Sequence, residues 1–161
     1  MAPSDIDLSS VVADEVEQLR GAHPSQRIEL TATGDTRGRW DGARLQQLLR
    51  NLVSNAIKYG SPNTPVRVAL RGEEADVRLE VTNSGPPIDP SALSGIFDPL
   101  NRGSLPSDSH DVRGGLGLGL FIVREIATAH GGAVEVRSDG ETTFALRLPR
   151  GESPRAAQVS A

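Results

Sequence analysis

The chain has 161 residues, a net charge of −4 and no cysteine. This length favours one domain with a hydrophobic core, and the lack of cysteine excludes disulfides and thiolate metal sites. Because the chain has 17 Lys and Arg but 21 Asp and Glu, its net charge gives no reason to expect a nucleic-acid partner. No segment approaches the roughly 20 apolar residues of a membrane span, and no signal peptide opens the chain. We therefore expect a cytoplasmic location without direct membrane contact.

The N-terminal segment predicts a short leader, residues 1–5, and then a helix. Asp7 is a candidate N-cap, and Gly21 follows the last turn. The apolar stripe of this helix comprises Leu8, Val12, Val16 and Leu19. Its acidic residues Asp14, Glu15 and Glu17 are expected on a solvated face. Alternation then predicts strands at 27–33 and 36–40, with Trp40 filling the core.

The stretch from Asp41 to Gly60 predicts the central helix, capped by Asp41 and ended by Gly60 in a left-handed conformation. Its apolar face comprises Leu45, Leu48, Leu49, Leu52, Val53 and Ala56. Beside this face, Asn51, Asn55 and Lys58 fall within about 60° of one another at roughly 100° per residue. An amide oxygen is a suitable Mg²⁺ ligand, and a lysine ammonium suits phosphates. The alternative is a helix with an ordinary polar edge.

The second half of the chain predicts two hairpins around a loop and a helix. Alternating residues at 66–70 and 77–82 form the first hairpin, which residues 83–88 end abruptly. One or two helical turns are expected at 90–97. Residues 98–114 are rich in Gly, Ser and Pro without periodicity, which predicts a functional lid or disorder. After the next helix, a hairpin around Asp139 and Gly140 closes the domain.

A glycine run, Gly114–Leu120, precedes that last helix. Glycines at alternate positions let backbone N–H groups approach a phosphate without Cβ obstruction, and a helix start adds donors and a partial positive charge. The run alone is equally compatible with a flexible connector. It is not a Walker loop, because no Gly-Lys-Ser/Thr follows, and no strand leads directly into it as a Rossmann turn requires.

The order of four segments, NLVSNAIKYG, NSGPPI, IFDPLNRG and GGLGLGLFIV, resembles the catalytic and ATP-binding domain of sensor histidine kinases. The resemblance covers residues 5–149. It implies the Bergerat fold, an α+β class: a two-layer α/β sandwich with a mixed, mostly antiparallel sheet and about three helices on one face. The catalytic domain would occupy residues 1–150, and residues 151–161 would form a flexible tail.

The same resemblance implies that the domain binds ATP with Mg²⁺, and it assigns roles by position. Asn55 would hold the metal, while Asn51 and Lys58 would contact the phosphates. Arg102 would reach the terminal phosphate from the lid, so Asn51, Lys58 and Arg102 are the implied catalytic residues. Tyr59 would pack by the adenine. The implied nucleotide-binding set is Asn51, Asn55, Lys58, Tyr59, Asn83, Gly85, Ile88, Phe97, Gly115, Leu116, Gly117, Leu118 and Gly119.

One departure from the family pattern concerns the adenine pocket. Asn83 stands where the family has an aspartate, with Gly85 below the ring, and Pro87 replaces a permissive glycine. An amide oxygen still accepts a hydrogen bond from an adenine amine, but more weakly than a carboxylate does. Asn83 and Pro87 together motivate an alternative function, a nucleotide-sensing pseudokinase or regulatory ATP-binding module without phosphotransfer. A purely structural interaction domain with an empty pocket is a third possibility.

A second departure concerns the phosphorylated histidine, which the family carries on a dimeric helical hairpin. His110 precedes an acidic residue but lies in the expected lid with no predicted helix, so it is not expected to accept the phosphoryl group. His23 and His130 are expected to be structural. We therefore expect a separate dimerisation and phosphoacceptor domain and a response regulator as partners, with this domain monomeric when isolated. The domain would act free in the cytoplasm or as the cytoplasmic part of a membrane sensor.

The residue type at position 51 distinguishes phosphoryl transfer to a protein from hydrolysis of ATP. Relatives that hydrolyse ATP carry a glutamate there, four residues before the metal-binding asparagine, as the base that activates water. An asparagine cannot take a proton at neutral pH. The resemblance therefore implies a protein-histidine kinase that transfers the γ-phosphoryl group to an external imidazole.

Overall fold

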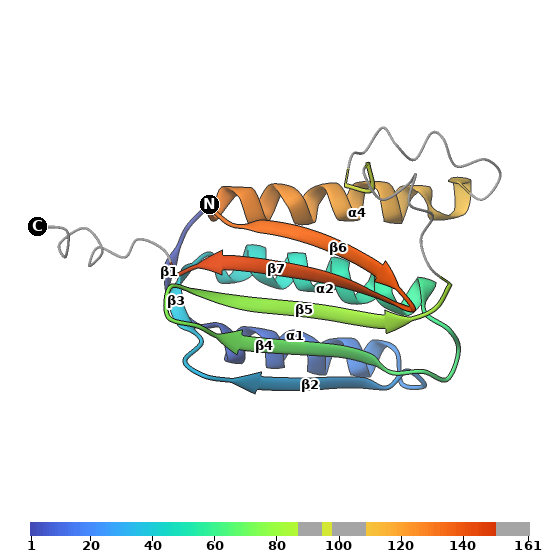
Figure 1. Cartoon of the computed structure of the whole chain (residues 1–161), viewed down its shortest axis with the longest axis horizontal. Coiled ribbons are helices and arrows are strands. Elements are labelled where there is room, and N and C mark those ends of the chain that lie inside the picture. Colours follow the sequence, from blue (N-terminus) through green and yellow to red (C-terminus); the bar gives the residue numbers. More distant parts are fainter. Residues whose placement is uncertain (87–94, 98–108, 151–161) are drawn as a thin grey trace, which may run out of the picture.

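The computed structural model describes residues 1–86, 95–97 and 109–150, and of residues 109–118 it describes the backbone. Within these residues the fold has two layers, a five-stranded sheet and three helices that cover one of its faces (Figure 1). The helices are α1 (Leu8–Ala22), α2 (Gly42–Tyr59) and α4 (Ser109–Ala129). The strands are β1 (Ser4–Asp7), β2 (Ile28–Thr33), β3 (Arg37–Trp40), β4 (Val66–Gly72), β5 (Asp76–Ser84), β6 (Ala133–Asp139) and β7 (Glu141–Pro149).

The large sheet has the strand order β2-β4-β5-β7-β6. Only the β2–β4 pair is parallel, and the other three pairs are antiparallel. Two of those pairs are the predicted hairpins, and Gly140 turns the second one with a φ of 81°. The predicted α+β class with a mixed, mostly antiparallel sheet is confirmed.

The N-terminal segment, predicted as a short leader, contributes a strand that the sequence did not predict. Ser4–Asp7 forms β1 and pairs antiparallel with β3 in a separate two-stranded sheet. The backbone N–H of Ala2 also donates to Oδ2 of Asp41, at 2.9 Å. The segment is short and lacks strong alternation, so its strand forms only because β3 offers an edge. The small sheet and the Ala2 hydrogen bond hold the start of the chain beside Asp41, the N-cap of α2.

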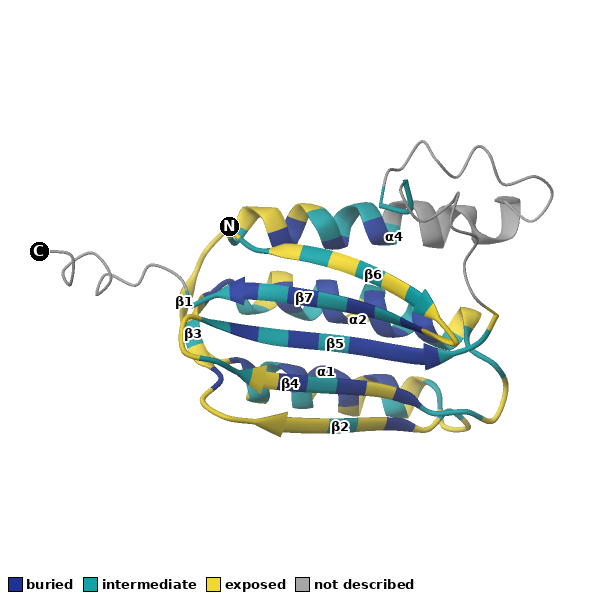
Figure 2. Cartoon of the chain, viewed as in Figure 1, coloured by how far each residue is buried: buried dark blue, intermediate teal, exposed yellow. Residues whose placement is uncertain are grey.

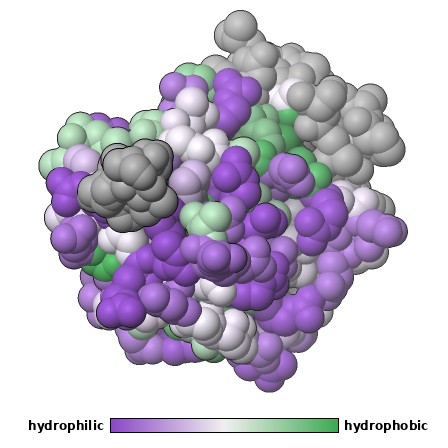
Figure 3. All heavy atoms as spheres, turned by 60° about the vertical axis from the view of Figure 1, so that its left-hand side comes forward, coloured by the Kyte–Doolittle hydropathy of each residue, from purple (hydrophilic) through white to green (hydrophobic). Residues whose placement is uncertain are grey.

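The core lies between the helices and the inner face of the sheet. Figure 2 shows buried positions alternating with less buried ones along β4 and β7. Trp40 is fully buried, as predicted, and its indole N–H donates to the carbonyl of Pro149 at 2.8 Å. All six predicted apolar residues of α2 are buried. Hydrophilic residues cover most of the described surface that comes forward in Figure 3.

Glu15 corrects the prediction that the acidic residues of α1 share a solvated face. It is only 2% exposed, and its carboxylate pairs with the guanidinium of Arg50 on α2, with Nε and Oε2 3.1 Å apart. Asp14 and Glu17 are exposed, as expected. Helical spacing places Glu15 on the apolar face, three residues after Val12 and four before Leu19, so the period already indicated its burial. The local pattern could not show its partner, because Arg50 lies on another helix.

Two backbone predictions near the glycines were also wrong. Gly60 is extended, with φ −76° and ψ 159°, and not left-handed. Helix α4 begins at Ser109, so the glycine run and His110 lie within a helix where the sequence predicted loop. Residues 98–108 lie outside the described residues, and so does the predicted tail 151–161.

Candidate nucleotide site

A cavity of about 210 Å³ lies between α2 and α4. Asn51, Asn55 and Lys58 all line it, so the predicted polar stripe of α2 does face one common cavity. Among the residues that the structure describes, the lining comprises Asn51, Ser54, Asn55, Lys58, Tyr59, Gly119 and Leu120. Sequence reasoning did not select Ser54 or Leu120; Ser54 lies three residues after Asn51 and four before Lys58, a helical spacing that could have found it.

The side-chain oxygen of Asn55 is buried without a hydrogen-bond partner. Among the described residues it is the one side-chain atom in this state. An unsatisfied buried acceptor costs roughly 1–3 kcal/mol, and this one belongs to a residue that lines the cavity. An amide oxygen with free lone pairs is the kind of hard, neutral ligand that Mg²⁺ takes alongside phosphate oxygens. The residue present therefore fits the implied metal.

Asn51 connects the two helices that form the cavity. Its Nδ2 donates to the backbone carbonyl of Gly119 on α4, at 3.3 Å. A Cβ built on Gly119 would lie 3.9 Å from the Asn51 side chain, which is ordinary van der Waals contact. Because its amide N–H is used in this way, Asn51 keeps its side-chain oxygen as the remaining acceptor.

Lys58 and Tyr59 stand at the C-terminal end of α2. The Lys58 ammonium lies 6.0 Å from the centre of the Tyr59 ring, at the outer range of a cation–π contact. Tyr59 is 36% exposed, one of the two large apolar side chains exposed in the described part of the chain. An exposed aromatic ring at a cavity mouth offers a surface on which a planar base can stack.

Asn83 and Gly85 lie at the end of β5, beside the last turn of α2. Asn83 is 5% exposed, and its Nδ2 donates to the carbonyl of Ser84 at 3.3 Å. A Cβ on Gly85 would come within 2.8 Å of the Tyr59 carbonyl, so close backbone packing requires this glycine. Neither residue lines the 210 Å³ cavity. Thr142, which sequence reasoning missed, pairs in register with Asn83 and is 4% exposed.

The remaining predicted residues fall into two groups. Ile88, Pro87 and Arg102 lie outside the described residues. Phe97 is described, and its ring packs edge-on against Phe144 with centroids 6.0 Å apart, which anchors this segment to the core.

The glycine run does not form a phosphate cradle in this structure. Gly115, Leu116, Gly117 and Leu118 lie inside α4, beyond its first turn. Backbone N–H groups there are paired with carbonyls four residues earlier, so they are not available to a phosphate. Glycine in a helix interior costs up to about 1 kcal/mol relative to alanine, so this part of α4 is intrinsically weak. The predicted phosphate contacts of these residues remain a prediction.

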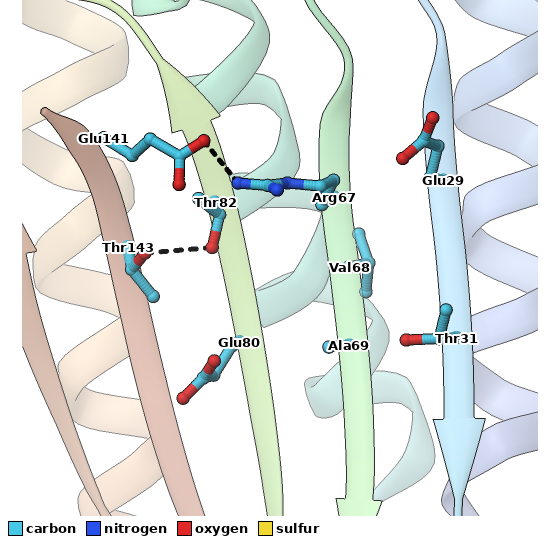
Figure 4. Close-up of a pocket in the computed structure, with 9 residues that line it drawn as sticks. All are labelled: Glu29, Thr31, Arg67, Val68, Ala69, Glu80, Thr82, Glu141 and Thr143. Atoms are coloured by element: carbon cyan, nitrogen blue, oxygen red, sulfur yellow. Dashed lines mark hydrogen bonds and ion pairs between the residues drawn. The ribbon is translucent and has the colours of Figure 1, made fainter.

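A larger hollow of about 380 Å³ lies on the open face of the sheet, away from the helices (Figure 4). Four of its polar side chains pair with one another: Arg67 pairs with Glu141, and the Thr82 and Thr143 hydroxyls are 2.9 Å apart (Figure 4). No orphaned buried atom occurs there among the described residues. The smaller cavity is therefore the better candidate site.

No described helix combines the length and apolar character needed to cross a membrane. Within the described residues, no three His, Asp or Glu side chains gather as a metal cluster either.

Comparison with known proteins places these features in a family. Residues 40–152 match the family model described as "Histidine kinase-, DNA gyrase B-, and HSP90-like ATPase". The chain is 37% identical over 148 residues to a bacteriophytochrome of Pseudomonas aeruginosa, covering 91% of this chain and 20% of that protein. It is 37% identical over 152 residues to the sensor histidine kinase TrcS of Mycobacterium tuberculosis, covering 90% of this chain and 29% of TrcS. The chain thus spans less than a third of either relative.

Comparison with solved structures supports the same family. The mycobacterial sensor histidine kinase MprB shares 27% identity and a TM-score of 0.76, over 91% of this chain and 96% of that one. A nucleotide-free catalytic domain of the histidine kinase ThkA shares 25% identity and a TM-score of 0.77, over 93% and 99%. The chain therefore belongs to the family of histidine kinase-, gyrase B- and HSP90-like ATPases, as a catalytic domain of the sensor histidine kinase type.

Proposed function

We propose that this domain binds MgATP and transfers the γ-phosphoryl group to a histidine on a separate dimerisation and phosphoacceptor domain. The observation that carries the proposal is the unpartnered oxygen of Asn55 in a cavity that also holds Asn51 and Lys58. Kinship with catalytic domains of histidine kinases supports the reaction class. The domain would work in the cytoplasm, where ATP is supplied.

Asn55 would hold Mg²⁺ through its amide oxygen. When bound, the metal would neutralise charge on the transferring phosphoryl group and orient it. Lys58 would place an ammonium on the same phosphates from one turn further along α2. Tyr59 would cover the base at the mouth of the cavity, and Arg102 would reach the terminal phosphate.

Asn51 favours transfer over hydrolysis. Its amide has no basic site at neutral pH, so it cannot activate water. Its N–H is also engaged by the Gly119 carbonyl, which fixes the side chain toward α4. With catalysis resting on position and charge alone, the attacking group must already be nucleophilic, as a neutral imidazole nitrogen is.

The partners follow from this chemistry. A phosphoacceptor domain must present its histidine at the cavity, and a response regulator would take the phosphoryl group onward. The histidine kinase ThkA, in a structure with the response regulator TrrA, shares 25% identity and a TM-score of 0.74 with this chain, over 92% of this chain and 42% of ThkA. That likeness supports a regulator as a partner here.

The test is phosphotransfer from radiolabelled ATP to an added phosphoacceptor domain from a homologous kinase. Asn55→Ala should lower transfer by at least 100-fold while the far-UV circular dichroism spectrum stays that of the native fold. Ser10→Ala, on an exposed position of α1, is the matched control. Unchanged transfer by Asn55→Ala would remove Asn55 from the mechanism.

A nucleotide sensor without phosphotransfer is the second candidate. It is favoured by Asn83, whose uncharged amide already donates to Ser84 and offers a weaker acceptor than a carboxylate. Calorimetry with MgATP followed by the transfer assay separates the two: binding without transfer to any tested acceptor domain would support the sensor.

A further inference from the structure

Ser54 lines the cavity but belongs to no predicted site. At about 100° per residue it lies roughly 60° from Asn51, on the side away from the apolar face of α2. From the core outward, the cavity wall of α2 therefore carries Asn55, Asn51, Lys58 and then Ser54. The outermost of these side chains is a small hydroxyl.

The Ser54 hydroxyl makes no hydrogen bond to any residue that the structure describes. A serine inside a helix commonly donates to the carbonyl four residues earlier, which here belongs to Arg50. That bond is absent, and Ser54 is half-buried on the cavity wall. Its O–H donor is therefore available to whatever occupies the cavity.

We propose that Ser54 donates a hydrogen bond to the phosphate chain of the bound nucleotide; this contact rests on the proposed function. Ser54 shares its helix face with the implied metal ligand and with Lys58, both phosphate-directed groups, so phosphate oxygens are its nearest acceptors. Tyr59, the side chain suited to the base, lies five residues further along. A hydrogen bond to a charged oxygen is stronger than one between neutral groups.

The experiment compares nucleotide affinities by calorimetry for the wild-type domain, Ser54→Ala and Ser54→Thr. Alanine favours helix more than serine does, so loss of fold does not confuse the result. Ser54→Ala should weaken MgATP binding by about tenfold. Affinity for adenosine, which lacks phosphate, should be unchanged, and Ser54→Thr should restore MgATP binding to within about threefold.

Ser10→Ala removes an exposed hydroxyl from α1 and should leave every affinity at the wild-type value. Equal MgATP affinity for the wild type and Ser54→Ala would overturn the Ser54 contact alone, and so would an equal loss for adenosine. Failure of the wild-type domain to bind MgATP would instead overturn the proposed function, and the Ser54 contact with it.

Discussion

The side-chain amide of Asn51 donates to the carbonyl of Gly119, 3.3 Å away on another helix. This bond ties α2, which carries the polar stripe, to the end of the glycine run in α4. One residue therefore positions both walls of the candidate site. Its sequence neighbours explain its direction, since Leu52 and Val53 are buried and turn Asn51 to the edge of the core.

Asn51→Asp should uncouple the two walls. The substitution removes the N–H donor and sets a carboxylate oxygen against the Gly119 carbonyl. We expect a loss of about 1–2 kcal/mol in the free energy of unfolding, measured by urea denaturation, with weaker MgATP binding. Gln47→Glu adds the same charge to the same helix and should cost less than half as much. Equal losses for the two variants would show that the bond to Gly119 contributes nothing specific.

Gly117→Ala should favour the helical form of the glycine run. Alanine stabilises a helix interior by up to about 1 kcal/mol over glycine. If nucleotide binding requires this segment to unwind and expose its amides, unwinding costs that much more free energy in the variant. We expect MgATP affinity to fall by about fivefold while thermal stability rises.

Gly21→Ala is the matched control, because it gains helix propensity in α1 where an added Cβ meets nothing within 4 Å. It should raise stability without changing affinity. If Gly117→Ala bound MgATP as tightly as the wild type, the segment would not unwind for the nucleotide.

The Glu15–Arg50 pair should respond asymmetrically to substitution. The Glu15 side chain is 3% exposed, whereas that of Arg50 is 52% exposed. Arg50→Ala leaves a buried carboxylate without its partner and should cost about 2–3 kcal/mol. Glu15→Gln leaves a guanidinium that water can solvate and should cost about 1 kcal/mol. Urea denaturation of both variants measures the difference, and the reverse order would contradict it.

Asp41 should contribute to the loss of stability in acid. The backbone N–H of Ala2 lowers the pKa of this carboxyl below its usual 3.8, and the N–H of Arg44 adds to the effect. A lowered folded-state pKa means that the stabilisation is complete above pH 3.8 and disappears as the pH falls through the folded value.

Asp41→Asn keeps a capping oxygen but cannot titrate. The gap in free energy of unfolding between wild type and Asp41→Asn should therefore be constant from pH 5 to 7 and shrink below pH 3.8. Denaturant titrations at each pH measure it, and a gap that stays constant down to pH 2.5 would refute the assignment.

The sequence predicted the parts of the fold that depend on local pattern. The apolar face of α2, the caps Asp7 and Asp41, both hairpins and the burial of Trp40 follow from spacing and turn residues, and the structure confirms them. The sequence also predicted that Asn51, Asn55 and Lys58 face one cavity, because helical spacing determines which side chains share a face of α2.

The features that the sequence did not predict depend on contacts between distant segments. Strand β1 exists through its pairing with β3, and Glu15 is buried through Arg50. The glycine run is helical although glycine disfavours helix, which the local signal could not anticipate. Thr142 carries no motif and became visible only through its strand register. The helical spacing of Ser54 was readable in the sequence, but its place on a cavity wall appears only in the fold.

The central claim is that the oxygen of Asn55 holds magnesium on the phosphates of a bound adenine nucleotide. The most direct measurement is calorimetry of ATP binding with and without Mg²⁺, for the wild-type domain and Asn55→Ala. We predict that Mg²⁺ raises the ATP affinity of the wild type by at least tenfold and that of Asn55→Ala by less than twofold. An equal gain from Mg²⁺ in both proteins would contradict the account.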